Sequence, residues 1–185
     1  MSNAAGVFAG CVFEEQSIME MRDVFLRDGT FTGMQIEKHT PMKKGWYLSH
    51  AIIIMKTMDG GYIMQQRALK AKYSAGMWDV TGGGVTAGET SAQAAVREAF
   101  EELGVIVRPE KLKHMLREIT EWGEDYGMIC DTYAVRVELP EGGFNIAGRE
   151  VNDVKVVPFE EFLETVTYNK TPEFRQMLHR VEKEV

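Results

Sequence analysis

Few cysteines, no long hydrophobic run and no excess of basic residues set the first limits on this 185-residue chain. Its two cysteines, Cys11 and Cys130, lie far apart and form no CxxC or Cys/His cluster, so we expect two reduced thiols. Lysine and arginine total 21 against 28 aspartates and glutamates, a net charge of -7. Such a protein repels phosphates, which argues against binding nucleic-acid polymers or anionic membranes. A phosphate ligand is therefore expected to be small and to arrive with a metal cation.

Apolar runs are too short for a membrane span, since AIIIM at 51–55 has only the length of a strand. The stretch GVFAGCVF near the start lacks the basic leader of a signal peptide, and a cytoplasmic protein is expected. The opening MSNA resembles the remnant of an expression tag. Residues 1–18 are therefore assigned to a tag and an N-terminal extension of unknown role.

Turn signals between alternating apolar residues predict one α/β domain of the α+β kind. Residues 19–39 are typical of a β-hairpin with Asp28 and Gly29 at its tip. Hairpin patterns outnumber β-α-β crossovers, so the sheet should be mixed or antiparallel. Further strands are expected at 46–58, 62–67, 111–122, 127–139 and 151–157, and two late helices should start near Pro158 and Pro172.

A helix with an acidic face is expected between Thr90 and Gly104. Thr90 can cap its start with Gln93 as the capping-box partner, and Gly104 can end it. The apolar residues at helical spacing, which should form one buried stripe, are Ala92, Ala95, Val96, Ala99, Phe100 and Leu103.

Glu98, Glu101 and Glu102 fall within a single sector of about 100° beside that stripe. Arg97 is the one local cation, and the helical spacing directs it well round the helix from them. Taken alone, such residues are typical of a solvated helix face, because acidic faces are common.

The loop before this helix changes that interpretation. From Gly83 to Val105 the chain reads GGVTAGETSAQAAVREAFEELGV, which resembles the signature of Nudix hydrolases: G, five residues, E, seven residues, REUxEExGU, where U is a bulky apolar residue. All seven fixed places would match by chance at on the order of one in 10⁸ start sites. The matching residues are Gly83, Glu89, Arg97, Glu98, Glu101, Glu102 and Gly104, with the small Ala99 in one U place.

The resemblance extends beyond the signature, over about residues 19–167. The segment from Tyr62 to Val85 and the preceding hairpin look like the Nudix branch similar to isopentenyl-diphosphate isomerase. The resemblance implies a Nudix fold, with a mixed β-sheet sandwiched between helices and an N-terminal β-hairpin. It divides a single domain, 19–185, into a hairpin (19–45), a core (46–167) and a C-terminal helix (168–185).

Clustered carboxylates suit Mg²⁺ or Mn²⁺, which prefer oxygen ligands and can offset the negative charge of a diphosphate. The resemblance implies Glu98 and Glu102 as direct ligands, Glu101 as a direct or water-mediated one, and a backbone carbonyl near Gly83. It also places Glu89 and Arg97 in an ion pair that braces the loop against the helix, with Arg97 counted among the catalytic group.

The general base is left open by the resemblance. Glu98 or Glu101 could take the proton from water. Outside the signature, Glu150 is the first candidate, followed by Glu124 and Asp125.

Candidate substrate contacts lie on the segment before the signature. Arg67 is the best placed for a phosphate, with Lys72 and the loop aromatic Tyr73 as further candidates. His50 matches a metal-binding histidine of the isomerases, but a satisfied histidine of the sheet is the better interpretation.

The function expected is a metal-dependent pyrophosphohydrolase that cleaves the diphosphate of a nucleoside diphosphate linked to another moiety, by water attack at phosphorus. One alternative is an isopentenyl-diphosphate isomerase-like enzyme, although this chain has TGGG at 81–84 where isomerases carry Cys and His. The other is a non-catalytic, ligand-sensing Nudix domain. A homodimer through the N-terminal hairpin is also expected from the resemblance.

Overall fold

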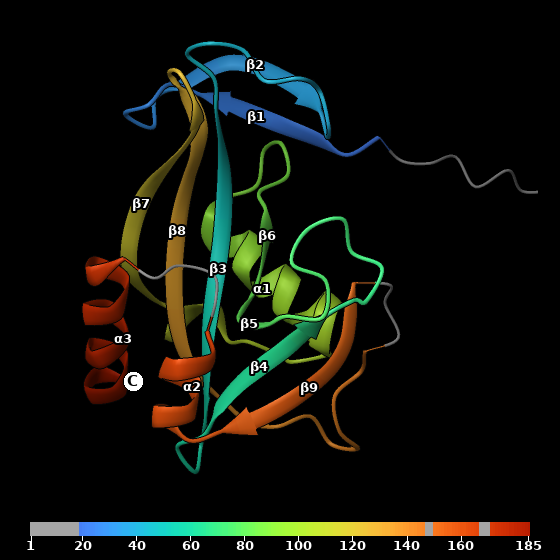
Figure 1. Cartoon of the computed structure of the whole chain (residues 1–185), viewed down its shortest axis with the longest axis vertical. Helices are drawn as coiled ribbons and strands as arrows, with labels where there is room; N and C mark the ends of the chain where they lie inside the picture. The colour runs from blue at the N-terminus through green and yellow to red at the C-terminus, as the bar shows by residue number, and fades with distance from the viewer. Residues whose placement is uncertain (1–18, 147–149, 167–170) are drawn as a thin grey trace, which may run out of the picture.

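One long strand, β3, lies at the centre of the sheet of this protein (Figure 1). The structure is a computed structural model that describes residues 19–146, 150–166 and 171–185, so Cys11 and the extension assigned to 1–18 lie outside it. β3 (Tyr47–Thr57) pairs with β8 (Tyr126–Val137) in parallel and with β1 (Met21–Phe25), β4 (Tyr62–Arg67) and β6 (Thr81–Gly84) in antiparallel fashion. The predicted mixed sheet is therefore confirmed.

The remaining strands extend the sheet from the neighbours of β3. β2 (Phe31–Glu37) pairs with β1, and β7 (Lys113–Gly123) pairs with β8. β5 (Trp78–Asp79) and β9 (Val151–Val157) both pair with β4. All of these pairs are antiparallel.

Helices cover both faces of the sheet, as predicted. α1 (Ser91–Leu103) lies behind β3 in Figure 1, whereas α2 (Phe159–Thr165) and α3 (Pro172–Glu184) lie in front. Alternate residues of β3 point to opposite faces, so Ile53 packs in the core under α1 and Ile52 in the core under α2 and α3. Burial on both faces explains why β3 reads as a continuous apolar run. A short 3₁₀ helix, Pro109–Lys111, follows α1. Among the described residues, no helix has the length and apolar character needed to cross a bilayer.

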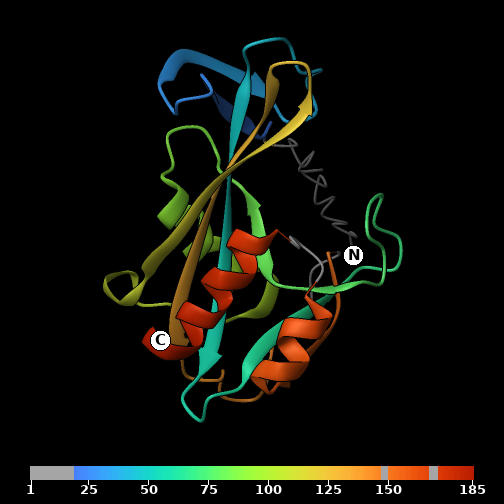
Figure 2. The same cartoon turned by 60° about the vertical axis from the view of Figure 1, so that its left-hand side comes forward.

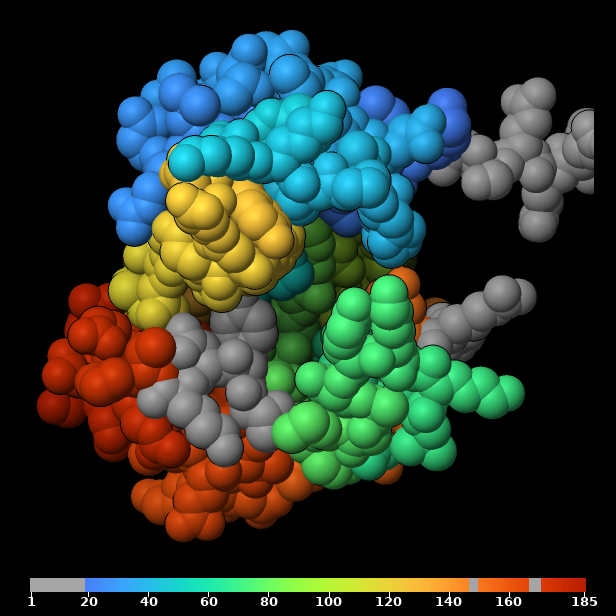
Figure 3. Space-filling model, turned by 45° about the horizontal axis from the view of Figure 1, so that its top comes forward, coloured from blue at the N-terminus to red at the C-terminus, as the bar shows by residue number. Residues whose placement is uncertain are grey.

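The predicted N-terminal hairpin is confirmed, and its turn is built as the sequence indicated. Gly29 has a φ of 87°, which favours glycine, and Asp28 Oδ1 accepts a hydrogen bond from the Thr30 amide at 2.9 Å. The hairpin crosses one end of the sheet, next to the turn between β7 and β8 (Figures 1 and 2). In the space-filling view, the surface is hollowed between this hairpin, the β7–β8 tip and the loop 68–77, with the β6–α1 region at the floor (Figure 3).

α1 begins and ends at the predicted residues. The Thr90 side chain accepts from the Gln93 amide, and the Gln93 side chain accepts from the Thr90 amide at 2.9 Å, which completes the capping box. Gly104 adopts the left-handed conformation, with φ of 70°. These caps fix the residues at which α1 begins and ends.

Candidate active site

The buried face of α1 carries two of the three glutamates. Glu98 and Glu102 are only 9% and 7% exposed, whereas Phe100, predicted to belong to the buried stripe, is 60% exposed. The prediction for Phe100 is wrong because the helix is rotated toward its acidic side. Small residues, Ala94, Ala95 and Ala99, let α1 approach the sheet closely, and the rotation brings the two carboxylates inside.

Glu102 lies against Gln65 on β4. Gln65 Nε2 donates to Glu102 Oε2 at 2.8 Å, and its carbonyl oxygen Oε1 is buried with no hydrogen-bond partner in the described structure. Burial raises the pKa of Glu102 to about 8, helped by the negative charges of Glu98 and Glu150 and opposed by the Gln65 hydrogen bond. The sequence prediction missed Gln65, although strand periodicity places it on the same face of β4 as Arg67.

Glu98 lies directly against the glycine-rich strand. A Cβ atom built on Gly83 would stand 2.0 Å from Glu98 Oε1, so only glycine leaves room for this carboxylate. Burial raises the pKa of Glu98, while Arg97 acts in the opposite direction through a hydrogen bond from Nη1 at 2.7 Å. The neighbouring charges of Glu101 and Glu150 raise the pKa further.

Arg97 connects the loop before α1 with the helix. Its Nε and Nη2 donate to the two oxygens of Glu89 at 3.0 Å each, so the predicted ion pair is present. Hydrogen bonds from Arg97 and from the Thr86 amide hold the pKa of Glu89 below its usual value, against the effect of burial. Arg97 Nη2 also donates to the Gly84 carbonyl at 3.1 Å, which ties β6 to α1.

The expected orientation of Arg97, well away from the acidic sector, is wrong. Arg97 Nη1 donates to Glu98 at 2.7 Å and to Glu101 Oε2 at 2.9 Å. A long, flexible side chain with five donors reaches across the helix surface, which spacing along a helical wheel does not anticipate. The Glu101 side chain, 56% exposed, is therefore held at the rim instead of inside with Glu98 and Glu102.

Two buried carboxylates with raised pKa values fit a hard divalent cation. Within the described residues, no three His, Cys, Asp or Glu side chains converge in a geometry that could hold a metal ion. Glu98 and Glu102 nevertheless repel each other at close range, and Glu150 adds negative charge to both. Carboxylate oxygens gathered in a buried site match the ligand preference of Mg²⁺ or Mn²⁺.

The NUDIX domain family matches residues 46–181, most of the chain. The chain belongs to the Nudix hydrolase family. It is 29% identical over 150 residues to Nudix hydrolase 3 of Arabidopsis thaliana, a match that covers 76% of this chain but only 19% of that protein's length. It is 27% identical over 122 residues to the RNA pyrophosphohydrolase of Nitratiruptor sp., covering 58% of this chain and 75% of that one.

Solved structures show the same fold at low sequence identity. The NUDIX domain of Shewanella oneidensis NrtR, a structure complexed with ADP ribose, aligns with a TM-score of 0.59 and 16% identity. The alignment covers 77% of this chain and 93% of that one. At this identity, the similarity establishes the Nudix fold of the chain.

In this Nudix hydrolase, the acids proposed as external bases lie in two places. Glu150 is exposed, its backbone oxygen accepts from the Ala68 amide at 2.8 Å, and its charge raises the pKa values of Glu98 and Glu102. Glu124 and Asp125 occupy the β7–β8 turn at the hairpin end, where Glu124 lies 3.8 Å from Lys44. Of the three, only Glu150 is electrostatically coupled to the signature glutamates in the described structure.

The predicted substrate residues gather around the loop after β4. Arg67 Nε donates to the Tyr73 carbonyl at 3.3 Å, and the Arg67 charge lowers the pKa of Glu102. Lys72 lies 5.2 Å from the centre of the Tyr73 ring, which is itself 70% exposed. Arg67 thus lies near the carboxylates, while Lys72 and Tyr73 are carried on the loop that borders the hollow of Figure 3.

His50 pairs with Gly84 across β3 and β6. Burial lowers the pKa of His50 to about 4, and the positive charges of Arg22 and Arg67 lower it further, so the imidazole is neutral at pH 7. The charges of two arginines therefore act on this histidine.

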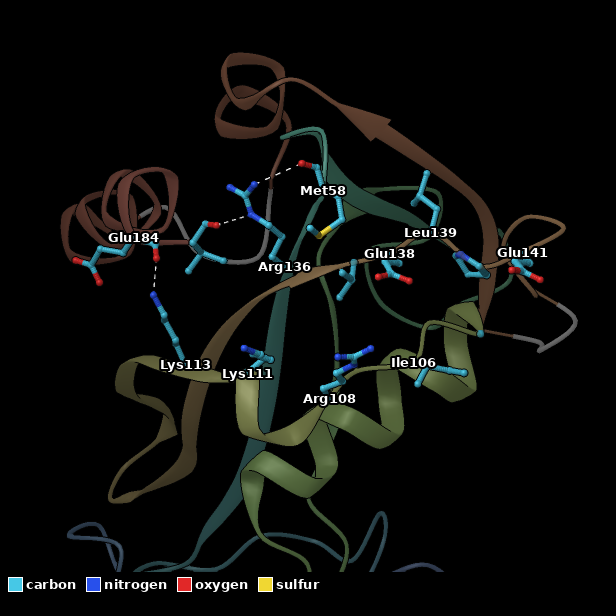
Figure 4. Close-up of a pocket in the computed structure, with 14 residues that line it drawn as sticks. Met58, Ile106, Arg108, Lys111, Lys113, Arg136, Glu138, Leu139, Glu141 and Glu184 are labelled. Carbon is cyan, nitrogen blue, oxygen red and sulfur yellow. Dashed lines mark hydrogen bonds between the residues drawn. The ribbon is translucent and has the colours of Figure 1, made fainter.

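A further cavity lies away from these residues. It has a volume of about 820 Å³ and opens beyond the C-terminal end of α1, between the basic side chains of Arg108, Lys111, Lys113 and Arg136 (Figure 4). Arg136 Nε donates to the Val185 carbonyl at 2.7 Å, and Lys113 donates to the Glu184 carbonyl. Apart from Gly104, none of the residues of the Nudix signature lines this cavity.

Proposed function

We propose that this Nudix hydrolase is a metal-dependent pyrophosphohydrolase that cleaves the diphosphate of a nucleoside diphosphate linked to another moiety. The observation that carries the proposal is the pair Glu98 and Glu102, buried side by side against Gly83 and Gln65. Buried carboxylates that repel each other destabilise a fold unless a cation offsets their charge. A divalent cation and an anionic substrate provide that charge balance.

Glu98, Glu102 and the backbone at Gly83 are proposed to hold Mg²⁺ or Mn²⁺. Glu101, at the rim and bonded to Arg97, is proposed to take part through water. When bound, the ion would offset the negative charge that protects a diphosphate against an attacking water. Glu89 supports Arg97, which in turn orients Glu98 and the Gly84 carbonyl.

Glu150 is proposed as the general base if the base lies outside the signature. It is exposed, which gives access to water, and its charge raises the pKa values of Glu98 and Glu102. Glu98 and Glu101 are the alternatives within α1. A Glu150→Gln variant that lost kcat without losing metal affinity would support Glu150, whereas unchanged kcat would transfer the role to α1.

Arg67, Lys72 and Tyr73 are proposed to contact the substrate. A guanidinium can hold a phosphate with two parallel hydrogen bonds, and Arg67 is the cation that acts on Glu102. Lys72 and Tyr73 lie together on an exposed loop, where an ammonium and an aromatic ring suit the outer part of a nucleotide. ADP ribose, bound by the NrtR domain, and the 5′ end of RNA define the first substrates to test.

The sequence resemblance to the isomerase-like branch is compatible with this hydrolase. An isomerase needs a proton donor and an acceptor on opposite faces of its carbon skeleton. Strand β6 offers three consecutive glycines there, and the neutral His50 alone cannot fill both roles. A ligand-sensing domain without catalysis has no need for buried, unbalanced carboxylates, which disfavours the third alternative.

Glu102→Gln tests the proposal most directly. We expect the variant to lose at least a hundredfold in Mg²⁺-dependent hydrolysis across a panel of ADP ribose, nucleotide sugars, dinucleoside polyphosphates, nucleoside triphosphates and 5′-triphosphorylated RNA. Glu110→Gln, an exposed glutamate of the 3₁₀ helix, is the matched control and should keep full activity. Retention of most activity by Glu102→Gln would contradict the metal assignment, and conversion of isopentenyl to dimethylallyl diphosphate would favour the isomerase.

A homodimer through the hairpin is also proposed. Leu26, Phe31 and Met34 of the hairpin are 43–49% exposed, more than large apolar side chains usually are. Light scattering at micromolar concentration should give twice the mass of 20.9 kDa, and a monomeric mass would refute the proposal.

A further inference from the structure

Arg22, on β1 of the N-terminal hairpin, is a buried cation with an incomplete set of partners. The residue is 7% exposed, its Nη2 is paired with Glu20, and its Nη1 is buried with no hydrogen-bond partner within the described chain. An unsatisfied donor on a buried charged group costs more than one on a neutral group. Such a group in a native structure calls for an explanation, such as a catalytic role or a bound water or ion.

The position of Arg22 depends on a glycine of the Nudix signature region. A Cβ atom built on Gly84 would stand 2.1 Å from Arg22 Nη1, so the guanidinium occupies the space that a side chain at Gly84 would fill. Gly84 is the last residue of β6 and follows Gly83, against which Glu98 packs. Neighbouring residues of a strand face opposite sides. The guanidinium and the Glu98 carboxylate therefore flank the end of β6 from its two sides.

Positive charge is in excess around Arg22. Glu20, its ion-pair partner, also accepts from Lys38 Nζ at 2.6 Å, so one carboxylate serves two cations. Arg67, from β4, acts together with Arg22 on His50, the sheet neighbour of Gly84.

We propose that Arg22 binds a phosphate group of the substrate, so that the N-terminal hairpin supplies part of the active site. The inference rests on the proposed hydrolysis of a diphosphate for the identity of its ligand. In the proposed site, a cation at Glu98 and Glu102 and hydrogen-bond donors beside it would each contact the two phosphates of such a substrate. Arg22 supplies those donors from the hairpin side of β6, and Arg67 from the β4 side. The hollow between hairpin and loop 68–77 gives the ligand a way in (Figure 3).

A purely structural role makes a different prediction. If Arg22 served only to attach the hairpin through Glu20, removing either partner would break the same ion pair and have the same effect. If Arg22 serves a phosphate, removal of Glu20 leaves the binding group in place with a less compensated charge. Arg22→Gln and Glu20→Gln therefore separate the two roles.

The probe is inorganic pyrophosphate, titrated calorimetrically into the full chain in the presence of EDTA, so that no metal contributes. We expect measurable binding by the unmodified protein, at least a tenfold loss of affinity in Arg22→Gln, and unchanged or tighter binding in Glu20→Gln. Arg27→Gln, which removes an exposed hairpin arginine paired with Glu121, is the matched control and should bind normally. Arg22→Lys keeps the positive charge but not the planar set of guanidinium donors, so its pyrophosphate affinity should fall several-fold. This variant should remain folded if Arg22→Gln does not.

The same variants separate this inference from the proposed hydrolase. In substrate turnover, Arg22→Gln should raise KM more than it lowers kcat. Three results would each overturn the phosphate role. The first is an equal pyrophosphate affinity of Arg22→Gln, Arg22→Lys and the unmodified protein. The others are equal losses of affinity in Arg22→Gln and Glu20→Gln, and no binding by the unmodified protein. Arg22-dependent binding in a chain that hydrolyses none of the panel would support the phosphate role and refute the hydrolase, while hydrolysis unaffected by Arg22→Gln would do the reverse.

Discussion

Single side chains decide how charge is balanced inside this protein. Gln65 illustrates this, because it gives Glu102 its hydrogen bond at 2.8 Å and buries an unpaired oxygen of its own beside it. A polar side chain buried at that cost serves to orient its partner. We therefore expect Gln65 to position the proposed metal ligand.

Gln65→Met tests that role by keeping side-chain length and removing both polar atoms. Loss of the donor leaves a buried carboxylate less satisfied, so the free energy of unfolding should fall by about 1–3 kcal/mol in EDTA. Mn²⁺ affinity, followed by electron paramagnetic resonance, should change as well. Gln35→Met, which loses only an exposed hydrogen bond to Asp23, should stay within about 0.5 kcal/mol. Equal effects of the two substitutions would contradict the positioning role.

Asp131 gives the protein a pH-dependent contribution to stability. Its side chain, 1% exposed, accepts from Arg117 Nε and Nη2 at 2.8 Å each, from Ser91 at 2.7 Å, and contacts His114 Nε2 at 2.8 Å. Burial alone would raise the pKa of Asp131, but the hydrogen bonds from Arg117, Ser91 and His114 lower it below its ordinary value.

Asp131→Asn should destabilise the protein by about 1–3 kcal/mol at pH 7, because hydrogen bonds to a charged group are lost while Arg117, with 56% of its side chain exposed, stays hydrated. The folded pKa lies below the unfolded value near 3.8, so this stabilisation is present above that pH and disappears as the pH falls through the folded pKa. Urea unfolding should therefore show a constant difference between variant and unmodified protein from pH 7 to about 5, and a smaller one below about pH 4. A difference that grew toward low pH would contradict the sign.

At the scale of elements, the buried face of α1 carries both apolar side chains and the glutamates proposed as metal ligands. Its caps at Thr90 and Gly104 and its length followed from local sequence signals, because capping depends on residues close in the chain. Its rotation did not, because both the apolar stripe and the acidic sector were possible inward faces. The sheet selected a face that includes Glu98 and Glu102 and leaves Phe100 outside.

The rotation of α1 predicts opposite outcomes for two apolar residues of the expected stripe. Leu103→Ala should lower the free energy of unfolding by about 2–5 kcal/mol, since Leu103 is fully buried and leaves a cavity. Phe100→Ala should cost less than about 1 kcal/mol, because most of the ring is already in water. Guanidinium chloride unfolding measures both, and a large loss for Phe100→Ala would indicate that the ring is covered in solution, for example by a second chain.

At the scale of the whole molecule, the proposed metal ion should stabilise the fold as well as act on substrate. A ligand that binds only the folded state at a hundred times its Kd adds about 2.7 kcal/mol. For a chain of this size, that corresponds to a rise in Tm of roughly 5–10 °C. Calorimetric scans with Mn²⁺ should show this rise, reversed by EDTA and absent in Glu102→Gln. An equal rise in that variant would place the ion elsewhere.

The sequence by itself determined the family, the caps of α1 and the hairpin turn, because each depends on residues at fixed, short spacing, and the family resemblance implied the pairing of Glu89 with Arg97. Only the tertiary structure decided which glutamates are buried, that Arg97 turns toward Glu101, that Gln65 bonds Glu102 and that Arg22 packs against Gly84. Those contacts join β1, β4, β6 and α1, elements far apart in the chain. Long-range packing sets the rotation of a helix and the surroundings of a charge, and no local pattern specifies either.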